Sequence, residues 1–149
     1  MEIRMRKFVG CIFVSISVLV GGPAWADDLT GADRFLCASV QATMCYEDGE
    51  CVIDLPWNVN VPAFIEVDLG TKHLRTTAAS ELNRATPINH VDRRDGAIVL
   101  QGYEMGRAFS WIITEATGQV TVAVAFEGAA VSVFGSCTPL ESTAELSQE

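Results

Sequence analysis

The chain has 149 residues, of which 10 are lysine or arginine and 19 are aspartate or glutamate, so its formal net charge is −9. An acidic excess of this size disfavours nucleic acids and anionic membrane surfaces as partners, because both repel it. It keeps a small domain in solution and would suit a cationic partner.

The first 26 residues predict a secretory signal peptide. Three basic residues open the chain, Arg4, Arg6 and Lys7. An uncharged run over residues 8–23 follows, and Ala24 and Ala26 are the small residues expected before a cleavage site. The run is shorter than the roughly 20 residues of a membrane span. We expect cleavage after Ala26, a periplasmic or secreted protein, and no membrane span in the mature chain.

Cys11 offers a weaker alternative, a lipoprotein that is acylated on this cysteine. Only residues 8–10 separate Cys11 from the charged start. An export signal needs an apolar stretch of about 7–15 residues before the cut, so this alternative is disfavoured.

The mature chain would be a single acidic domain. Cleavage leaves 123 residues with 7 basic and 18 acidic side chains, a net charge of −11. That length is enough to bury a hydrophobic core of its own. We expect one β domain over residues 27–140 and a flexible acidic tail over residues 141–149.

The first segment of the mature chain carries two conflicting signals. Thr30 and Asp33 resemble a helix capping box, and the apolar residues after them fit a helical stripe. The Asp48-Gly49 turn that follows favours a hairpin instead. Both alternatives stay open, and we favour a strand over residues 35–45 because it could lie beside the last strand of the chain.

Four cysteines remain after cleavage: Cys37, Cys45, Cys51 and Cys137. An even number in an oxidising compartment predicts two disulfides, although four cysteines allow three pairings. Cys45 and Cys51 flank the short Asp-Gly loop, so a bridge between them is the simplest choice and leaves Cys37 for Cys137. A zinc site is disfavoured, because no closely paired cysteines are present and neither histidine is near them.

From residue 63 onward, short alternating apolar runs separated by turn signals predict an antiparallel meander. The predicted strands cover residues 64–68, 73–77, 88–92, 97–103, 109–114, 120–126 and 131–137. These are seven strands, and residues 35–45 would supply an eighth. Residues 55–62 and 78–87 are loops, the second with room for one helical turn. Because closure removes exposed sheet edges, we expect an all-β, up-and-down barrel or a flattened sandwich. Its interior is either filled or holds one small ligand.

Catalytic and metal-binding motifs do not stand out. His73 and His90 have no assignable nucleophile or orienting acid, and Glu66 with Asp68 is one acid pair among many. The acidic residues 47–50 lack the spacing of a calcium loop. We therefore expect a non-enzymatic protein without a cofactor or a metal ion.

Residues 100–111 are the most distinctive stretch, because two glycines and three aromatic residues meet in one hairpin. As a binding rim, Tyr103 and Trp111 would offer flat faces and Arg107 a cation for a carboxylate or a sugar. As a structural element, the aromatic residues would cap the barrel. We favour the structural alternative, with Trp111 turned toward the core.

Several short motifs lie along the mature chain: residues 61–69, residues 95–102, Gly106-Arg107, Ser110-Trp111, residues 116–118 and the terminal Phe134-Gly135-Ser136-Cys137-Thr138-Pro139. Together they resemble a family of small exported bacterial proteins that have no assigned activity. The resemblance implies a shared β domain and transfers no catalytic residue. The general plan of a signal peptide, a β meander and a late cysteine is also similar to periplasmic lysozyme inhibitors.

The sequence therefore predicts a non-enzymatic exported β domain, a binding or accessory module of the cell envelope. One alternative is an inhibitor of a cationic hydrolase such as lysozyme, which the negative charge would help to bind. Another is a carrier that holds a small apolar ligand inside the barrel. The expected partner is accordingly a cationic protein or a small ligand, and not a nucleic acid.

Overall fold

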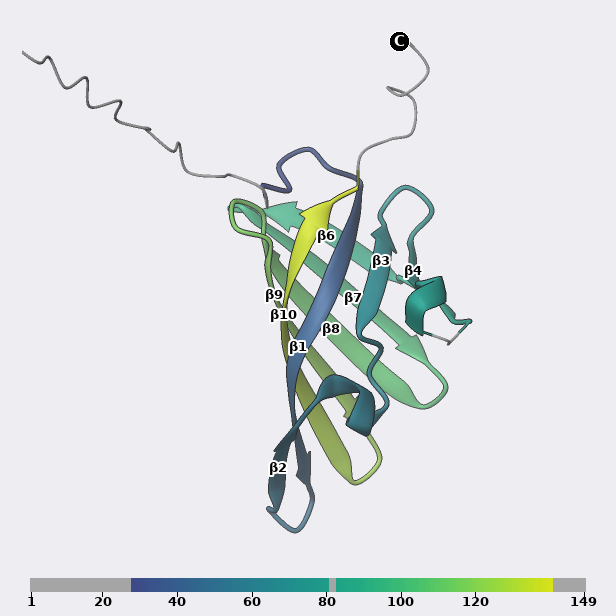
Figure 1. Ribbon diagram of the computed structural model, residues 1–149, viewed down its shortest axis with the longest axis vertical. Coiled ribbons are helices and arrows are strands. Elements are labelled where there is room, and N and C mark those ends of the chain that lie inside the picture. The colour runs from purple at the N-terminus through teal and green to yellow at the C-terminus, as the bar shows by residue number, and fades with distance from the viewer. Residues whose placement is uncertain (1–27, 81–82, 141–149) are drawn as a thin grey trace, which may run out of the picture.

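The structure is a computed structural model that describes residues 28–80 and 83–140. The predicted signal peptide and acidic tail lie outside the described residues. The described chain is all-β, which confirms the predicted fold class, and its antiparallel sheet curls into a half-barrel (Figure 1). Its strands are β1 (Arg34–Tyr46), β2 (Cys51–Asp54), β3 (Phe64–Asp68), β4 (His73–Thr76), β5 (Ala85–Pro87), β6 (His90–Arg94), β7 (Ala97–Glu104), β8 (Arg107–Thr114), β9 (Gln119–Phe126) and β10 (Ala129–Pro139). Two short 3-10 turns are η1 (Pro56–Val59) and η2 (Ala78–Ser80).

The sheet is an up-and-down meander into which the first strand is inserted. Its order is β5-β4-β3-β1-β10-β9-β8-β7-β6, so β1 joins the last strand to β3. The two ends of this path, β5 and β6, are consecutive in the chain and are joined by residues 88 and 89. The Ile88 N–H donates to the Lys72 carbonyl on the β4 side at 2.9 Å, and the Asn89 N–H donates to the Gln101 carbonyl on the β7 side at 2.9 Å. Backbone hydrogen bonds of these two residues therefore link the β4 side of the sheet to the β7 side.

The structure has ten strands where the sequence indicated seven to eight. The two additional strands are short, with 4 residues in β2 and 3 in β5. β2 pairs only with β1, and β5 pairs only with β4 and ends at Pro87, a residue that suits a sheet edge. Such edge segments carry too few residues to show an alternating pattern.

β1 is a strand along its whole length, and a bulge explains why its sequence resembles a helix. Its pairing with β10 shifts register between Ser39 and Gln41. Buried positions therefore change from Phe35 and Cys37 before the bulge to Ala42 after it. A one-residue insertion breaks the period of two, so no single alternation runs through the segment.

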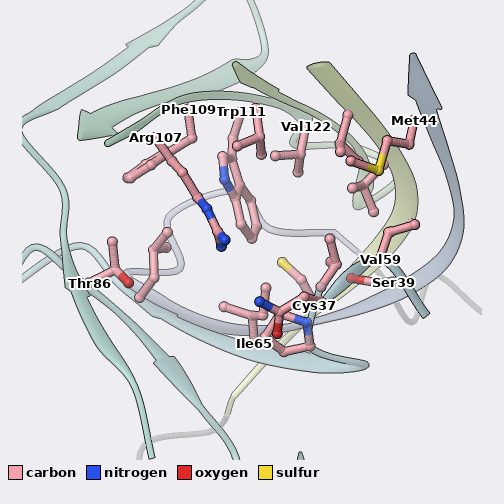
Figure 2. Close-up of a pocket in the computed structure, with 18 of the residues that line it drawn as sticks. Cys37, Ser39, Met44, Val59, Ile65, Thr86, Arg107, Phe109, Trp111 and Val122 are labelled. Atoms are coloured by element: carbon pink, nitrogen blue, oxygen red, sulfur yellow. The ribbon is translucent and has the colours of Figure 1, made fainter. Parts of the chain in front are cut away.

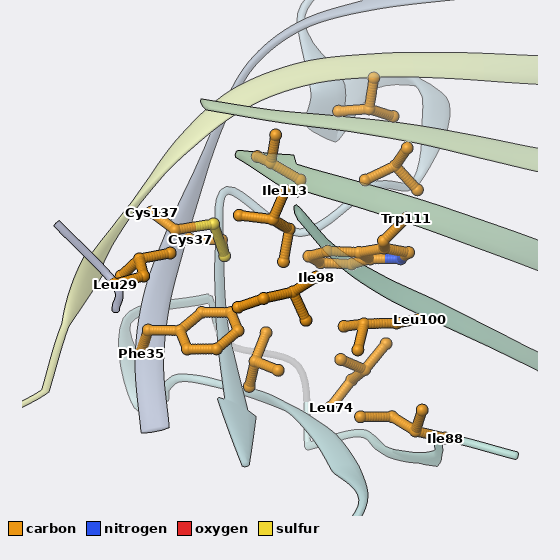
Figure 3. Close-up of a cluster of buried hydrophobic side chains, with 14 of the residues drawn as sticks. Leu29, Phe35, Cys37, Leu74, Ile88, Ile98, Leu100, Trp111, Ile113 and Cys137 are labelled. Carbon is orange, nitrogen blue, oxygen red and sulfur yellow. A yellow bond between two sulfur atoms is a disulfide. The ribbon is translucent and has the colours of Figure 1, made fainter. Parts of the chain in front are cut away.

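The hydrophobic core fills one end of the half-barrel. Phe35, Ile98, Leu100 and Ile113 are buried there, and Trp111 lies beside them (Figure 3). Leu29 covers this end, because its N–H donates to the Glu115 carbonyl at 2.8 Å. The largest fully buried side chains therefore gather at one end of the half-barrel.

Both disulfides form in the expected pairing. Cys37 bonds to Cys137, its direct cross-strand partner between β1 and β10. Cys45 bonds to Cys51, its partner between β1 and β2. The first bridge lies inside the half-barrel beside the core (Figure 3). It ties the inserted first strand to the last strand of the meander.

Across residues 28–80 and 83–140, no helix has the length and apolar character to cross a membrane.

Candidate ligand cavity

The half-barrel is filled at one end and hollow at the other. A cavity of about 550 Å³ lies on the concave side of the sheet, next to the core. Inward-facing residues of β9 and β10 form much of its wall: Val120, Val122, Val124, Val131 and Val133. Valine is short, so these strands line the space without filling it. Trp111 and Cys37 form the boundary toward the core (Figure 2).

The segment around η1 supplies another wall of the cavity. Val59 and Val61 line the space, and both are partly buried against the core cluster. Asp54 holds the start of this segment, because its Oδ1 accepts from the Leu55 N–H at 2.7 Å and from Asn58 Nδ2 at 2.7 Å. The hydrogen bond from Asn58, followed by the one from Leu55, lowers the pKa of Asp54. The Asp54 carboxylate therefore stabilises the local conformation of the segment around η1.

The cavity opens between polar side chains. Thr86 Oγ1 donates to Glu104 Oε2 at 2.5 Å, and Arg84 Nη2 donates to Asn60 Oδ1 at 2.9 Å. All four of these residues line the cavity. These four residues therefore supply a hydroxyl, a carboxylate, an amide and a guanidinium, whereas the rest of the lining is mainly apolar.

Arg107 is the second cation of the lining. Its guanidinium lies 5.6 Å from the centroid of the Phe126 ring. Figure 2 shows the side chain reaching past Phe109 and Trp111 toward the middle of the cavity. Within the part of the chain that the structure describes, no ion pair involves Arg107.

The structure brings together two of the three residues of the predicted rim. Arg107 and Trp111 both line the cavity, and Trp111 is only 4% exposed. Tyr103 is 61% exposed and does not line the cavity. It follows Gly102 and precedes Glu104 on β7, so strand alternation directs it to the opposite face. The indole of Trp111 is both a buried structural side chain, as expected, and a wall of the cavity.

Gly102 and Phe109 form a close pair that shapes the cavity. They are cross-strand partners between β7 and β8. A Cβ atom placed on Gly102 would lie 2.2 Å from Cζ of Phe109. The Phe109 ring thus packs directly on the glycine backbone and lines the cavity from there. The Gly-x(6)-Phe spacing across a tight hairpin was the available sequence signal for this contact.

Three of the other residues considered from sequence, His73, Glu66 and Asp68, make local contacts. His73 Nδ1 is 2.7 Å from the Thr71 carbonyl oxygen, and Glu66 pairs with Arg34. Asp68 accepts from the Thr71 N–H at 2.8 Å, and this hydrogen bond is the main cause of its lowered pKa. Among the described residues, no cluster of three or more histidine, cysteine or acidic side chains could hold a metal ion.

Sequence reasoning missed most of the cavity wall. Met44, Val59, Arg84 and Phe126 line the space, but they belong to four segments that are distant in sequence. The valines of β9 and β10 alternate with more exposed residues along each strand, and only their small size hinted that the interior was not filled.

No known protein-family model matches the chain, and no curated protein matches it either. The resemblances drawn from the sequence therefore stay predictions.

Proposed function

We propose that this protein is an exported binding module that takes up a small apolar molecule in the hollow end of its half-barrel, and that it acts by binding and not by catalysis. The observation that carries the proposal is the cavity of about 550 Å³ lined by valines, Phe109 and Trp111. Ligand sites are typically concave, mainly apolar spaces of about 300–1,000 Å³ with a few polar groups that orient the ligand. The cavity has the size and the lining of this class.

The frame around the cavity supports a preformed site. The bridge from Cys37 to Cys137 joins β1 to β10, both of which contribute residues to the cavity. The bridge from Cys45 to Cys51 joins β1 to β2, and Val52 and Asp54 of β2 line the cavity. A site that is rigid before binding loses less entropy when the ligand enters. Disulfides persist mainly in oxidising compartments, which supports a periplasmic or secreted location.

The alternative of a hydrolase inhibitor has less support. It rests on the net charge of −11 expected for the mature chain. The cavity has no part in that alternative, whereas the carrier alternative requires it.

A neutral fluorescent probe tests the proposal. Phenylnaphthylamine brightens when it leaves water for an apolar site, so the folded protein should enhance its emission with saturable binding. Val124→Trp would place an indole inside the cavity and reduce its free volume, and the matched control Thr121→Trp adds the same side chain to an exposed position of the same strand. We expect the first variant to bind the probe more weakly and the second to bind it as the unmodified protein does, with both melting as folded proteins.

Two results would overturn the proposal. One is the absence of saturable binding by the unmodified protein. The other is equal binding by the two variants, which would place the probe outside the cavity.

A further inference from the structure

We infer that the ligand is an amphipathic anion, with an apolar chain in the cavity and an acidic head group against Arg107. This inference rests on the proposed function and adds the chemical class of the ligand. It follows from the position of the Arg107 guanidinium, from the hydrogen bonds that the nearby carboxylates already accept, and from the apolar lining of the cavity.

Arg107 is directed into the site. It is the first residue of β8, and its side chain runs over the Phe126 ring toward the centre of the space (Figure 2). A guanidinium carries five N–H donors in a planar fork that matches a carboxylate or a phosphate. In the part of the chain that the structure describes, the guanidinium lies over the face of the Phe126 ring, which cannot accept its planar set of hydrogen bonds. The site thus presents hydrogen-bond donors without a matching acceptor.

The acidic residues of the lining do not supply that acceptor. Glu104 is the cross-strand partner of Arg107, yet its Oε2 accepts from the Thr86 hydroxyl at 2.5 Å. Asp54 accepts from Leu55 and Asn58, as described above. Arg84, the other cation of the lining, donates to Asn60. The lining carboxylates and Arg84 therefore hydrogen-bond to uncharged groups, whereas Arg107 has neither a hydrogen bond nor an ion pair among the described residues and keeps its whole fork of donors for a ligand charge.

The apolar lining specifies the rest of the ligand. Beyond Arg107, the space continues along Trp111 and Val122 (Figure 2), and Val133 also lines it. A short polar anion would leave these surfaces in contact with water, and a neutral hydrocarbon would leave the guanidinium without a partner. A molecule with an apolar chain and a terminal acid satisfies both regions.

The acidic surface of the protein does not oppose this class of ligand at contact distance. Long-range repulsion from the net charge is screened over about 8 Å at physiological ionic strength. The guanidinium acts at hydrogen-bond distance, where a direct charge-assisted contact with the head group outweighs the screened repulsion. Local complementarity therefore decides which head group binds.

Competition against phenylnaphthylamine tests the inference with three molecules of equal chain length: laurate, lauryl alcohol and dodecylammonium. Because charge-assisted hydrogen bonds are about twice as strong as neutral ones, we expect laurate to compete about tenfold or more better than the alcohol. Dodecylammonium should compete least. Arg107→Gln should remove the advantage of laurate and leave the affinity for the alcohol unchanged.

Arg75→Gln is the matched control, because Arg75 is exposed on β4 and does not line the cavity. It should keep the preference for laurate. Equal competition by laurate and the alcohol would overturn the inference and leave the proposed function standing. A parallel loss of both ligands in Arg107→Gln would also overturn it, by assigning Arg107 a packing role. Failure of the unmodified protein to bind any of the probes would overturn the proposed function itself.

Discussion

The two disulfides offer a direct test of how the sheet is held together, because they share one chemistry and differ in the loop they close. The sequence separation is 100 residues for Cys37 and Cys137 and 6 residues for Cys45 and Cys51. Replacing both cysteines of one bridge by alanine frees the corresponding loop in the unfolded chain. The long loop gains far more conformational entropy than the short one.

The chain-entropy model gives a loss of about 4.7 kcal/mol for the long loop and about 2.2 kcal/mol for the short one. The free energies of unfolding of the two double variants should therefore differ by about 2.5 kcal/mol. Burial increases the difference, because Cys37 and Cys137 are 3% and 1% exposed and their truncation opens space beside the core. A total stability of about 5–15 kcal/mol makes this difference large enough to measure.

Equilibrium unfolding in urea measures both variants against the parent protein, and the free energies of unfolding extrapolated to water are compared, because opening a loop expands the unfolded chain and raises the slope. The Cys37→Ala/Cys137→Ala variant should be the less stable. An equal loss of stability in the two variants, or a larger loss in Cys45→Ala/Cys51→Ala, would refute the account of β1 as an inserted strand pinned to β10 by the long-range bridge.

Three further outcomes are expected. Trp111→Ala should cost about 3–5 kcal/mol in urea unfolding, because the indole is buried against the core, and a parental midpoint would place the ring outside it. Gly102→Ala should displace the Phe109 ring, lowering both stability and binding of phenylnaphthylamine; unchanged binding would separate Phe109 from the cavity. The lowered pKa of Asp68 means that its carboxylate stabilises the fold above the ordinary pKa of 3.8 and loses this effect as pH falls below that value. Asp68→Asn should therefore reduce the loss of stability in acid, measured by urea unfolding at several pH values. An identical pH profile in the variant and the parent protein would contradict the Thr71 contact.

The sequence was sufficient for the main architecture, because most strands are long enough to show their alternation. β7 to β10 each have at least 8 residues and clear turns between them, so their pairing could be predicted. The alternation of β8 also placed Trp111 in the interior, where it is buried. The short strands β2 and β5 show no such pattern and were missed.

β1 shows how a single bulge obscures an alternating pattern, although the strand favoured from the sequence is confirmed. The inserted residue near Ser39 turns an alternating strand into a sequence that fits a helical stripe. The bulge itself depends on Gly135 of β10, where a Cβ atom would lie 2.2 Å from the Ala38 carbonyl oxygen. The glycine and the strand it accommodates are almost a hundred residues apart, so no local window reveals their relation.

The cavity was beyond sequence analysis for a different reason. Alternation predicts which side chains face inward, but the volume they enclose depends on the curvature of the sheet and on the segment across from it. The valines of β9 and β10 would fill a flat sandwich and leave a curled sheet hollow. The separation of Tyr103 from Arg107 was within reach, because neighbouring residues of a strand point to opposite faces.

A methyl-resolved NMR titration with laurate tests the central claim most directly, since it asks where in the protein the ligand lies. Val122, Val124, Val131 and Val133 line the cavity, and Val40 is an exposed valine of β1 outside it. The account predicts saturable shifts of the four cavity valines and none at Val40. Shifts at Val40 without changes in the cavity valines, or no shifts at all, would contradict the assignment of the hollow half-barrel as a binding site.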